Sequence, residues 1–341
     1  MRTFRLLLLP LSWIYGLILG LRHFLYDRGV FKSYTSKIRT IAIGNLSFGG
    51  TGKTPLIDYL ADQLDPNKSV IISRGYGRKT RGTILVEKTM SAEEVGDEPL
   101  LLKKRNPEIN VVVDEDRTRA IQFIEKKELP TETILLDDAL QHRKINPHLS
   151  ILLTTWQSPF CNDHLFPAGN LRDIKSRKQD ADVLIVTKTP RTAGKEEKFA
   201  LKERLGLSSG QELFFAGIKY QSVHELATDN EIEISDRVVL LSAIANADLF
   251  ERQAKEKTMV LKHFKYRDHH LFKESELQAL SDFIDTFEGL KPLVLTTEKD
   301  AQRLLAYSDF FKERQIRVGY WKIKIDFGSE KERFNSLIQN G

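Results

Sequence analysis

The stretch that decides the fold is GNLSFGGTGKTP, which runs from Gly44 to Pro55. A segment rich in β-branched residues, 38–43, leads into it, and a segment of helix-forming residues begins at Lys53. Strand, glycine-rich loop and helix, with Lys-Thr in the first helical turn, follow one another in a phosphate-binding P-loop. Such a loop turns backbone N–H groups towards an anion, and the helix N-terminus adds a positive dipole. The sequence therefore predicts a nucleotide-binding α/β protein.

The phosphate cradle differs at one position from a strict G-x-x-x-x-G-K-[ST] motif, because Ser47 stands where that motif has glycine. The glycines that follow must therefore form the cradle. We expect Lys53 to reach the β- and γ-phosphates and Thr54 to ligate Mg²⁺. The predicted nucleotide-binding residues are Ser47, Phe48, Gly49, Gly50, Thr51, Gly52, Lys53 and Thr54.

Apolar segments alternate with helical segments along the rest of the chain. Continuous apolar runs such as 151–154 and 183–187 are typical of strands that are buried on both faces. We expect an α/β fold, with a mostly parallel sheet of the P-loop NTPase type that is covered by helices. The other expected strands are 69–73, 83–86, 110–113, 133–136, 213–218, 232–241, 259–264, 293–297 and 316–321.

The domain organisation follows from length and from a change of character after Pro190, where a charged helical segment begins. A chain of 341 residues suggests about two domains. We expect a membrane-associated N-terminal helix over 1–30 and a P-loop kinase core over 31–200. A smaller C-terminal α/β domain over 201–341 is expected to complete the active site.

Composition excludes several classes of protein. The net charge of +5 is weak for 341 residues, and no nucleic-acid-binding motif accompanies it, so we expect no nucleic acid partner. Cys161 is the single cysteine, which excludes a disulfide framework and a cysteine zinc site and fits a reducing cytosol.

The N-terminus carries an uncharged, apolar segment from Leu6 to Leu21, flanked by Arg5 and Arg22. The segment is shorter than the ~20 residues that a membrane span needs, and Pro10 interrupts it. No cleavage site of the signal-peptide type follows. We therefore expect a helix that lies in the cytoplasmic leaflet and is held partly by Arg and Lys contacts to anionic lipids. A helix buried against the domain is the alternative.

Two pairs of carboxylates are candidates for the chemistry. Asp137 and Asp138 follow an apolar strand, where a Walker B acid would bind Mg²⁺ or its waters. Asp97 and Glu98, in the sequence GDEP, open a predicted helix. They either complement the helix dipole, or one of them accepts a hydroxyl proton while the other helps to hold the metal.

The triplet Asp268-His269-His270 is a further candidate, although no other His or Cys residues have the spacing that would complete a zinc site.

The choice of nucleotide follows from a missing motif. Neither Thr187–Pro190 nor Thr297–Asp300 matches the loop that recognises guanine, which favours ATP over GTP. Arginines that could clamp a phosphate bidentately are Arg74, Arg78, Arg117, Arg119 and Arg172. The predicted substrate or charge clamp is Arg74, Arg117, Arg119, His142 and Arg172.

These motifs, in this order, resemble one family over almost the whole chain: the tetraacyldisaccharide 4′-kinases of lipid A synthesis. The resemblance rests on more segments than the P-loop alone. They are 10–29, GNLSFGGTGKTP, SRGYGRK at 73–79, GDEP, DDALQH at 137–142, PAGNLRD at 167–173, the DHH triplet and TTEKDAQRL at 296–304. The family usually has Gly, Pro and Glu where this chain has Ala139, Asn170 and Asp173.

The resemblance implies that ATP, with Mg²⁺, phosphorylates the 4′-hydroxyl of a lipid A disaccharide 1-phosphate at the cytoplasmic face of the bacterial inner membrane. It implies that Asp97 is the base and that a histidine of the triplet is paired with it. We expect this histidine to be His269, so the predicted catalytic residues are Asp97, His269 and Asp268. It also implies that Arg117 and Arg172 steady charge or substrate. The implied metal set is Thr54, Glu98, Asp137 and Asp138.

Two other functions remain open from the residues alone. One is a P-loop kinase or ligase for a soluble small molecule, in which the N-terminal helix is only structural. The other is a nucleotide-dependent switch recruited to the membrane, which would need segments that reorder when the γ-phosphate is lost. The switch leaves the carboxylates and histidines of GDEP and DHH without a use. The sequence does not determine the acyl chains of a substrate or the oligomeric state.

Overall fold

The computed structural model describes residues 5–127, 130–268 and 270–340. They form two compact units. One comprises Met1–Ile218 with Ile325–Gly341, and the other comprises Lys219–Lys324.

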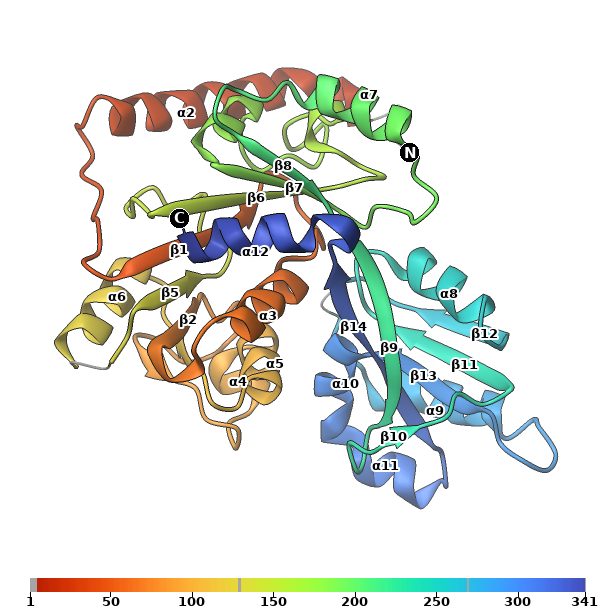
Figure 1. Ribbon diagram of the computed structural model, residues 1–341. Helices are drawn as coiled ribbons and strands as arrows, with labels where there is room; N and C mark the ends of the chain where they lie inside the picture. Colours follow the sequence, from red (N-terminus) through yellow and green to blue (C-terminus); the bar gives the residue numbers. More distant parts are fainter. Residues whose placement is uncertain (1–4, 128–129, 269, 341) are drawn as a thin grey trace. The chain divides into compact units, whose positions relative to one another are not determined.

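The first unit is built on an eight-stranded sheet in the order β3-β4-β2-β5-β1-β6-β7-β8 (Figure 1). All neighbouring strands are parallel except β3 and β4, which are antiparallel. The strands are β1 (Arg39–Asn45), β2 (Ser69–Ser73), β3 (Ile84–Leu85), β4 (Asn110–Val113), β5 (Thr133–Leu136), β6 (Leu149–Thr155), β7 (Val183–Thr187) and β8 (Glu212–Phe215).

Helices cover both faces of this sheet, which explains why its strands are apolar along their whole length. On one face, Leu56 and Phe334 belong to the same buried cluster as Ile41 and Ile43 of β1. On the other face, Ile121 packs with Ala42. The helices of the unit are α2 (Leu9–Asp27), α3 (Lys53–Gln63), α4 (Ala92–Val95), α5 (Asp97–Arg105), α6 (Arg117–Lys126), α7 (Lys195–Leu205) and α12 (Lys331–Asn340). Short 3-10 turns lie at Leu6–Leu8, Pro66–Lys68, Phe160–Asn162, Lys175–Asp180 and Gly328–Glu330.

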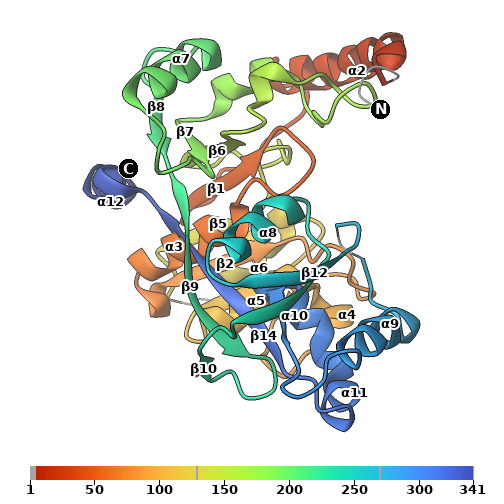
Figure 2. The ribbon, with the colours of Figure 1, turned by 90° about the vertical axis from the view of Figure 1, so that its right-hand side faces the viewer.

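The N-terminal helix α2 presents a broad apolar surface. Together with the preceding turn it spans Leu6–Asp27, with a mean hydropathy of 1.5, and by length and composition it could cross a membrane. Leu17 is 74% exposed and Trp13 67% exposed, whereas Ser12 and His23 on the opposite face are buried. Figure 2 shows α2 beside the loops that follow β6. The other large exposed apolar side chains of α2 are Leu11, Ile14, Ile18, Leu21 and Phe24.

The second unit has a six-stranded sheet in the order β10-β9-β14-β13-β11-β12. Strands β14, β13, β11 and β12 are parallel neighbours, and β10 pairs with β9 in the antiparallel direction. The strands are β9 (Gly217–Glu225), β10 (Glu231–Ile232), β11 (Arg237–Ser242), β12 (Met259–Lys265), β13 (Leu293–Thr297) and β14 (Val318–Asp326). The helices are α8 (Ala247–Lys255), α9 (Glu274–Ile284), α10 (Glu298–Leu304) and α11 (Ser308–Glu313), with a 3-10 turn at Leu305–Tyr307.

The bounds of the units differ from the expected division at residue 200. Strand β8 pairs with β7, so the chain stays in the first unit until it leaves within β9. It returns within β14, and Phe327 and Phe334 then join the first unit's core. The assignment of separate functions to the ranges 1–30, 31–200 and 201–341 stays a prediction.

Candidate functional site

The loop between β1 and α3 has the backbone of a phosphate cradle. Gly49 and Gly52 have φ values of 104° and 91°, which side chains disfavour, and Gly52 caps α3. Gly44 must also be glycine, because a Cβ there would lie 2.8 Å from Leu140. The hydroxyl of Thr187 on β7 donates to the carbonyl of Thr51 (2.6 Å). The loop is therefore held from β7, two strands away from β1 in the sheet.

Lys53 and Thr54 are the first two residues of α3. The Lys53 Nζ lies 3.3 Å from Asn45 Oδ1 and 3.6 Å from Asp138 Oδ1. The buried hydroxyl of Thr51 finds no hydrogen-bond partner among the described residues. The loop thus offers the ammonium group of Lys53 and the buried hydroxyl of Thr51 as hydrogen-bond donors, which fits a phosphate-bearing ligand.

Asp137 and Asp138 follow β5, which pairs with β1, and so lie at the same edge of the sheet as the cradle. Asp137 accepts a hydrogen bond from Ser73 (2.8 Å). Burial, with help from the charges of Glu98 and Asp138, raises the pKa of Asp137 to about 6. Burial opposes ionisation at Asp138 too, but hydrogen bonds from Arg172 and the charge of Lys53 lower its pKa to about 2.

The residues present fit a magnesium ion. Asp137 Oδ1 is buried and has no hydrogen-bond partner among the described residues, and carboxylate oxygens are the ligands that Mg²⁺ prefers. No group of three or more His, Cys, Asp or Glu side chains forms a ready-made cage within the described chain. That suits Mg²⁺, which usually binds one or two carboxylates together with water and substrate phosphates.

The GDEP segment places Asp97 and Glu98 in the first turn of α5, both half-buried. The carboxylate of Asp97 accepts the backbone N–H of Glu98 (3.1 Å). Because Glu98 raises the pKa of Asp137, this turn lies near the end of β5. The other end of α5 is tied to the P-loop helix, since Asp58 accepts hydrogen bonds from Arg105 (2.8 Å) and from the residue after it.

Two of the predicted clamp residues meet at Asp138. Arg172 donates to both Asp138 carboxylate oxygens, with Nη1 2.8 Å from Oδ2, and also to Asn45. Arg117 opens α6 and donates to the carbonyls of Asp137 and Asp138 (3.3 Å each). Its Nε is buried and unpartnered among the described residues. The structure therefore brings both guanidinium groups to Asp138, Arg172 to its carboxylate and Arg117 to its backbone carbonyl.

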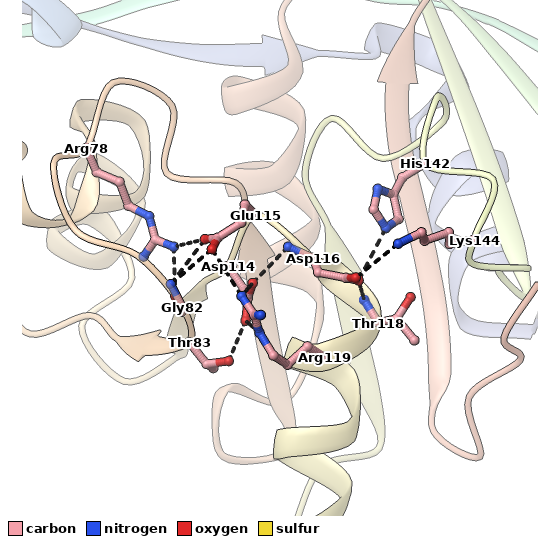
Figure 3. A network of polar contacts seen from close by, with 10 residues as sticks. All are labelled: Arg78, Gly82, Thr83, Asp114, Glu115, Asp116, Thr118, Arg119, His142 and Lys144. Atoms are coloured by element: carbon pink, nitrogen blue, oxygen red, sulfur yellow. Dashed lines mark hydrogen bonds and ion pairs between the residues drawn. The ribbon is translucent and has the colours of Figure 1, made fainter.

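Arg119 belongs to a polar network that includes the loop before α6 (Figure 3). It binds Asp114 through two hydrogen bonds (2.8 and 2.6 Å) and Glu115 through a third (3.1 Å). Its role as a clamp stays a prediction, although its side chain already has these carboxylate partners.

His142 lies at the other end of the same network, with Nε2 3.7 Å from Asp116 Oδ1 (Figure 3). Burial and the charge of Arg117 lower the pKa of His142 to about 4, so the ring is neutral at pH 7. Arg74 is exposed, and its charge contributes to the lowered pKa of Arg117, after burial. His142 and Arg74 therefore lie near Arg117.

The DHH triplet belongs to the second unit, and His269 lies outside the described residues. Asp268 is 3.9 Å from the Nζ of Lys299. His270 contacts the carboxylate of Glu276 (2.8 Å) and stacks on Tyr266 at 4.8 Å between ring centres. The pairing of Asp97 with His269 stays a prediction.

Sequence reasoning missed several residues that line or hold the site. Asn45 and Ser73 end β1 and β2 and contact Lys53 and Asp137. Their position at the ends of two predicted strands is the feature of the sequence that could have indicated a place in the site. His23 of α2 contacts Asp173 at 2.7 Å, and no local pattern indicates that pairing because 150 residues separate the two.

Comparisons with known proteins agree across the chain. The family model described as LpxK, tetraacyldisaccharide-1-P 4′-kinase, matches residues 4–341. A relative from Porphyromonas gingivalis named tetraacyldisaccharide 4′-kinase is 37% identical and covers 97% of this chain and 96% of its own. One of the same name from Flavobacterium johnsoniae is 35% identical, with 99% and 98% covered. A crystal structure described as "apo" form LpxK from Aquifex aeolicus in complex with ATP is 30% identical, with a TM-score of 0.74 and 99% of both chains covered.

Proposed function

The chain belongs to the LpxK family of tetraacyldisaccharide-1-P 4′-kinases, and we propose that it transfers the γ-phosphoryl group of ATP to the 4′-hydroxyl of a tetraacyldisaccharide 1-phosphate. The product would be lipid IVA, a precursor of lipopolysaccharide. The observation that carries the proposal is the meeting of the P-loop lysine and two strand-end acids at one sheet edge. Lys53 follows β1 and its loop, and Asp137 and Asp138 follow the adjacent strand β5.

ATP would bind with its phosphates in the cradle formed by residues 47–54. The positive φ values of Gly49 and Gly52 suit a loop whose backbone N–H groups bind an anion, and the N-terminus of α3 attracts negative charge. Lys53, which rests on Asn45 and Asp138, would exchange these contacts for phosphate oxygens. The complex of the Aquifex aeolicus protein with ATP supports this choice of nucleotide.

Mg²⁺ would be held by Asp137 and Asp138 with the hydroxyl of Thr54, and Glu98 would bind its waters. The unpartnered, buried Oδ1 of Asp137 supports this assignment. When bound, the ion neutralises charge on the β- and γ-phosphates. Asp137, whose pKa is about 6, is ionised at pH 7 and would gain a positive partner.

The transfer itself forms one bond from the acceptor oxygen to the γ-phosphorus and breaks the bond to the leaving oxygen of ADP. The acceptor hydroxyl loses its proton in this step, and we assign Asp97 as the carboxylate that receives it. Lys53, Arg117 and Arg172 would spread the charge that develops on the transferred group. Their guanidinium and ammonium groups already lie within hydrogen-bonding or ion-pair distance of the residues at the end of β5.

A membrane location suits an acylated substrate that cannot leave the bilayer. We place the protein at the cytoplasmic face of the inner membrane, as a peripheral or monotopic protein held by α2. The support is the exposed apolar surface of that helix, including Leu17 and Trp13. The reducing environment suggested by the lone Cys161 and the need for ATP favour the cytoplasmic side.

The test is the position of the new phosphate. Protein, ATP, Mg²⁺ and tetraacyldisaccharide 1-phosphate in mixed micelles should give a product with a second phosphomonoester, seen by phosphorus NMR. A 4′-deoxy analogue of the same lipid serves as the control and should give none. Phosphate incorporated into the 4′-deoxy analogue, or no incorporation into either lipid by folded protein, would contradict the proposal.

A further inference from the structure

A buried acid–base pair joins the apolar helix to the loop beside the P-loop. His23 Nε2 on α2 lies 2.7 Å from Asp173 Oδ1, and each side chain is only 3% exposed. The other ring nitrogen of His23 is buried without a hydrogen-bond partner among the described residues. Burying such polar groups without satisfying all of them is a poor source of stability. The pair therefore calls for a role other than holding the fold together.

The loop after β6, which contains Asp173, contacts both α2 and the loop between β1 and α3. On the α2 side, Ser12 donates to the carbonyl of Leu165 (2.9 Å). On the other side, the backbone N–H of Phe48 donates to the carbonyl of Asn170 (2.8 Å). One segment of chain thus contacts both the apolar helix and the phosphate cradle.

Arg172 sits at the centre of this arrangement, immediately before Asp173. Its backbone N–H donates to the carbonyl of Leu46 (2.8 Å), and its carbonyl accepts from the hydroxyl of Tyr15 on α2 (3.0 Å). The backbone N–H and carbonyl of Arg172 are therefore both held by hydrogen bonds. Asp173, the next residue, is held through its carboxylate by His23. From this position the guanidinium reaches Asp138 at 2.8 Å.

We propose that His23 and Asp173 are positioning residues for phosphoryl transfer, and that the hydrogen-bond contact between their side chains holds Arg172 in register with Asp138 and the P-loop. The proposal rests on the proposed function and deepens it. The apolar helix is then part of the nucleotide site's framework as well as its contact with lipid. Because the hydrogen bonds of His23 and Asp173 do not include Asp137 or Asp138, their effect on these carboxylates passes through Arg172.

Asp173→Asn tests the proposal with little change in shape. We expect kcat to fall at least tenfold, while KM for the disaccharide lipid stays within twofold of the wild-type value. His23→Gln approaches the same pair from the other partner and should give the same division between kcat and KM. The second variant keeps the test valid if the first does not fold, which a thermal melt reports.

Ser12→Ala is the matched control. Ser12 is as buried as His23 and joins the same helix to the same loop, but it bonds to the backbone of Leu165 and Ala168 rather than to Arg172 or Asp173. We expect kcat of this variant to stay within twofold of wild type. An equal loss of kcat in Ser12→Ala and Asp173→Asn would overturn the proposal in favour of a general loosening of the helix.

A double-mutant cycle separates positioning from a purely structural role. In an Arg172→Met background, Asp173→Asn should lower kcat by less than twofold further, because its target is gone. Undiminished loss in that background, or wild-type kcat in both Asp173→Asn and His23→Gln, would overturn the proposal. If the wild-type protein transfers no phosphate at all, the proposed function itself fails, which is a different result.

Discussion

At the scale of single residues, the site contains two neighbouring carboxylates whose pKa values are shifted in opposite directions. Asp137 is buried, accepts one hydrogen bond from Ser73, and has a pKa raised to about 6. Asp138 is also shielded by burial, but Arg172 and Lys53 lower its pKa to about 2. Cations therefore compensate the charge on Asp138, whereas burial outweighs the charge of Lys53 at Asp137, so that ionised Asp137 opposes folding.

Asp137→Asn should therefore stabilise the nucleotide-free protein while it abolishes metal-dependent turnover. A carboxyl whose pKa rises from 3.8 to about 6 on folding costs stability as pH increases through that interval, up to about 3 kcal/mol above pH 6. The amide has no charge to bury. In thermal or denaturant unfolding, the gain from Asp137→Asn should be largest at pH 8 and about half as large at pH 5.

Asp236→Asn is the control for that experiment, because its side chain is exposed and should shift stability little at either pH. A stability gain from Asp137→Asn that is the same at pH 5 and pH 8 would contradict the account, since ionisation would then not be its cause. Kinetics on the same variant should show a large loss of kcat.

Much of the site could be predicted from local sequence. The cradle, Lys53 and the Asp137-Asp138 pair were predictable because a P-loop and a strand-end acid are each encoded within a few residues. Arg172 donates to the carboxylate of Asp138, and Arg117 donates to the backbone carbonyls of the same pair. Contacts such as His23 with Asp173 could not be predicted, because they depend on how distant segments pack rather than on spacing along the chain.

At the scale of elements, α2 divides into two faces with different tasks. One face contacts the loop after β6 through Ser12, Tyr15 and His23. The other exposes a continuous set of apolar side chains that includes Leu17 at 74% exposure. Exposed apolar patches of this kind are typical of interaction sites. This exposed face supports the proposed membrane association of α2.

Leu17→Glu should weaken binding to vesicles that contain anionic lipid. Burying a leucine side chain contributes about 1.5–3 kcal/mol, so its loss, with an added negative charge, predicts at least a tenfold weaker partition in co-sedimentation. Phe199→Glu is the matched control, since Phe199 on α7 is 64% exposed and lies outside α2. Equal binding of both variants would contradict the membrane role of α2.

The strands show where sequence patterns succeed. Segments 69–73, 110–113, 133–136, 183–187 and 293–297 form strands with the expected bounds, because apolar runs bounded by polar residues leave little choice of ends. The segment 232–241 does not form one strand. It divides into β10 and β11, because Glu231 and Ile232 pair with β9 whereas Arg237–Ser242 joins the parallel part of the sheet.

At the scale of the whole molecule, the end of the chain is part of the first unit. Residues 325–341 return to it, and Phe334 of α12 is fully buried in the cluster that contains β1 and the P-loop helix. The hydroxyl of Tyr59 on α3 also donates to Asn335 (2.6 Å). The expected division at residue 200 was based on a local change in composition after Pro190. Local composition does not indicate that a later segment returns to an earlier unit, so residues 325–341 were assigned to the C-terminal domain.

Phe334→Ala should destabilise the first unit by about 3–5 kcal/mol, because it leaves a cavity in a packed core. Unfolding should be followed with and without ATP, since a ligand raises the midpoint only of the unit that binds it. Phe199→Ala, which removes an exposed ring, should change stability by less than about 0.5 kcal/mol. If Phe334→Ala leaves the ATP-protected transition unchanged, α12 is not part of the nucleotide-binding unit's core.

The most direct test of the account compares the wild-type protein with Asp97→Asn in transfer of label from γ-labelled ATP to tetraacyldisaccharide 1-phosphate. Glu108→Gln, an exposed change just beyond the other end of α5, is the control. We predict transfer by the wild type and the control, and a kcat lowered by about 10²–10⁴ in Asp97→Asn with ATP affinity little changed. Near wild-type turnover by Asp97→Asn would reject Asp97 as the base, and absence of transfer by all three folded proteins would contradict the kinase itself.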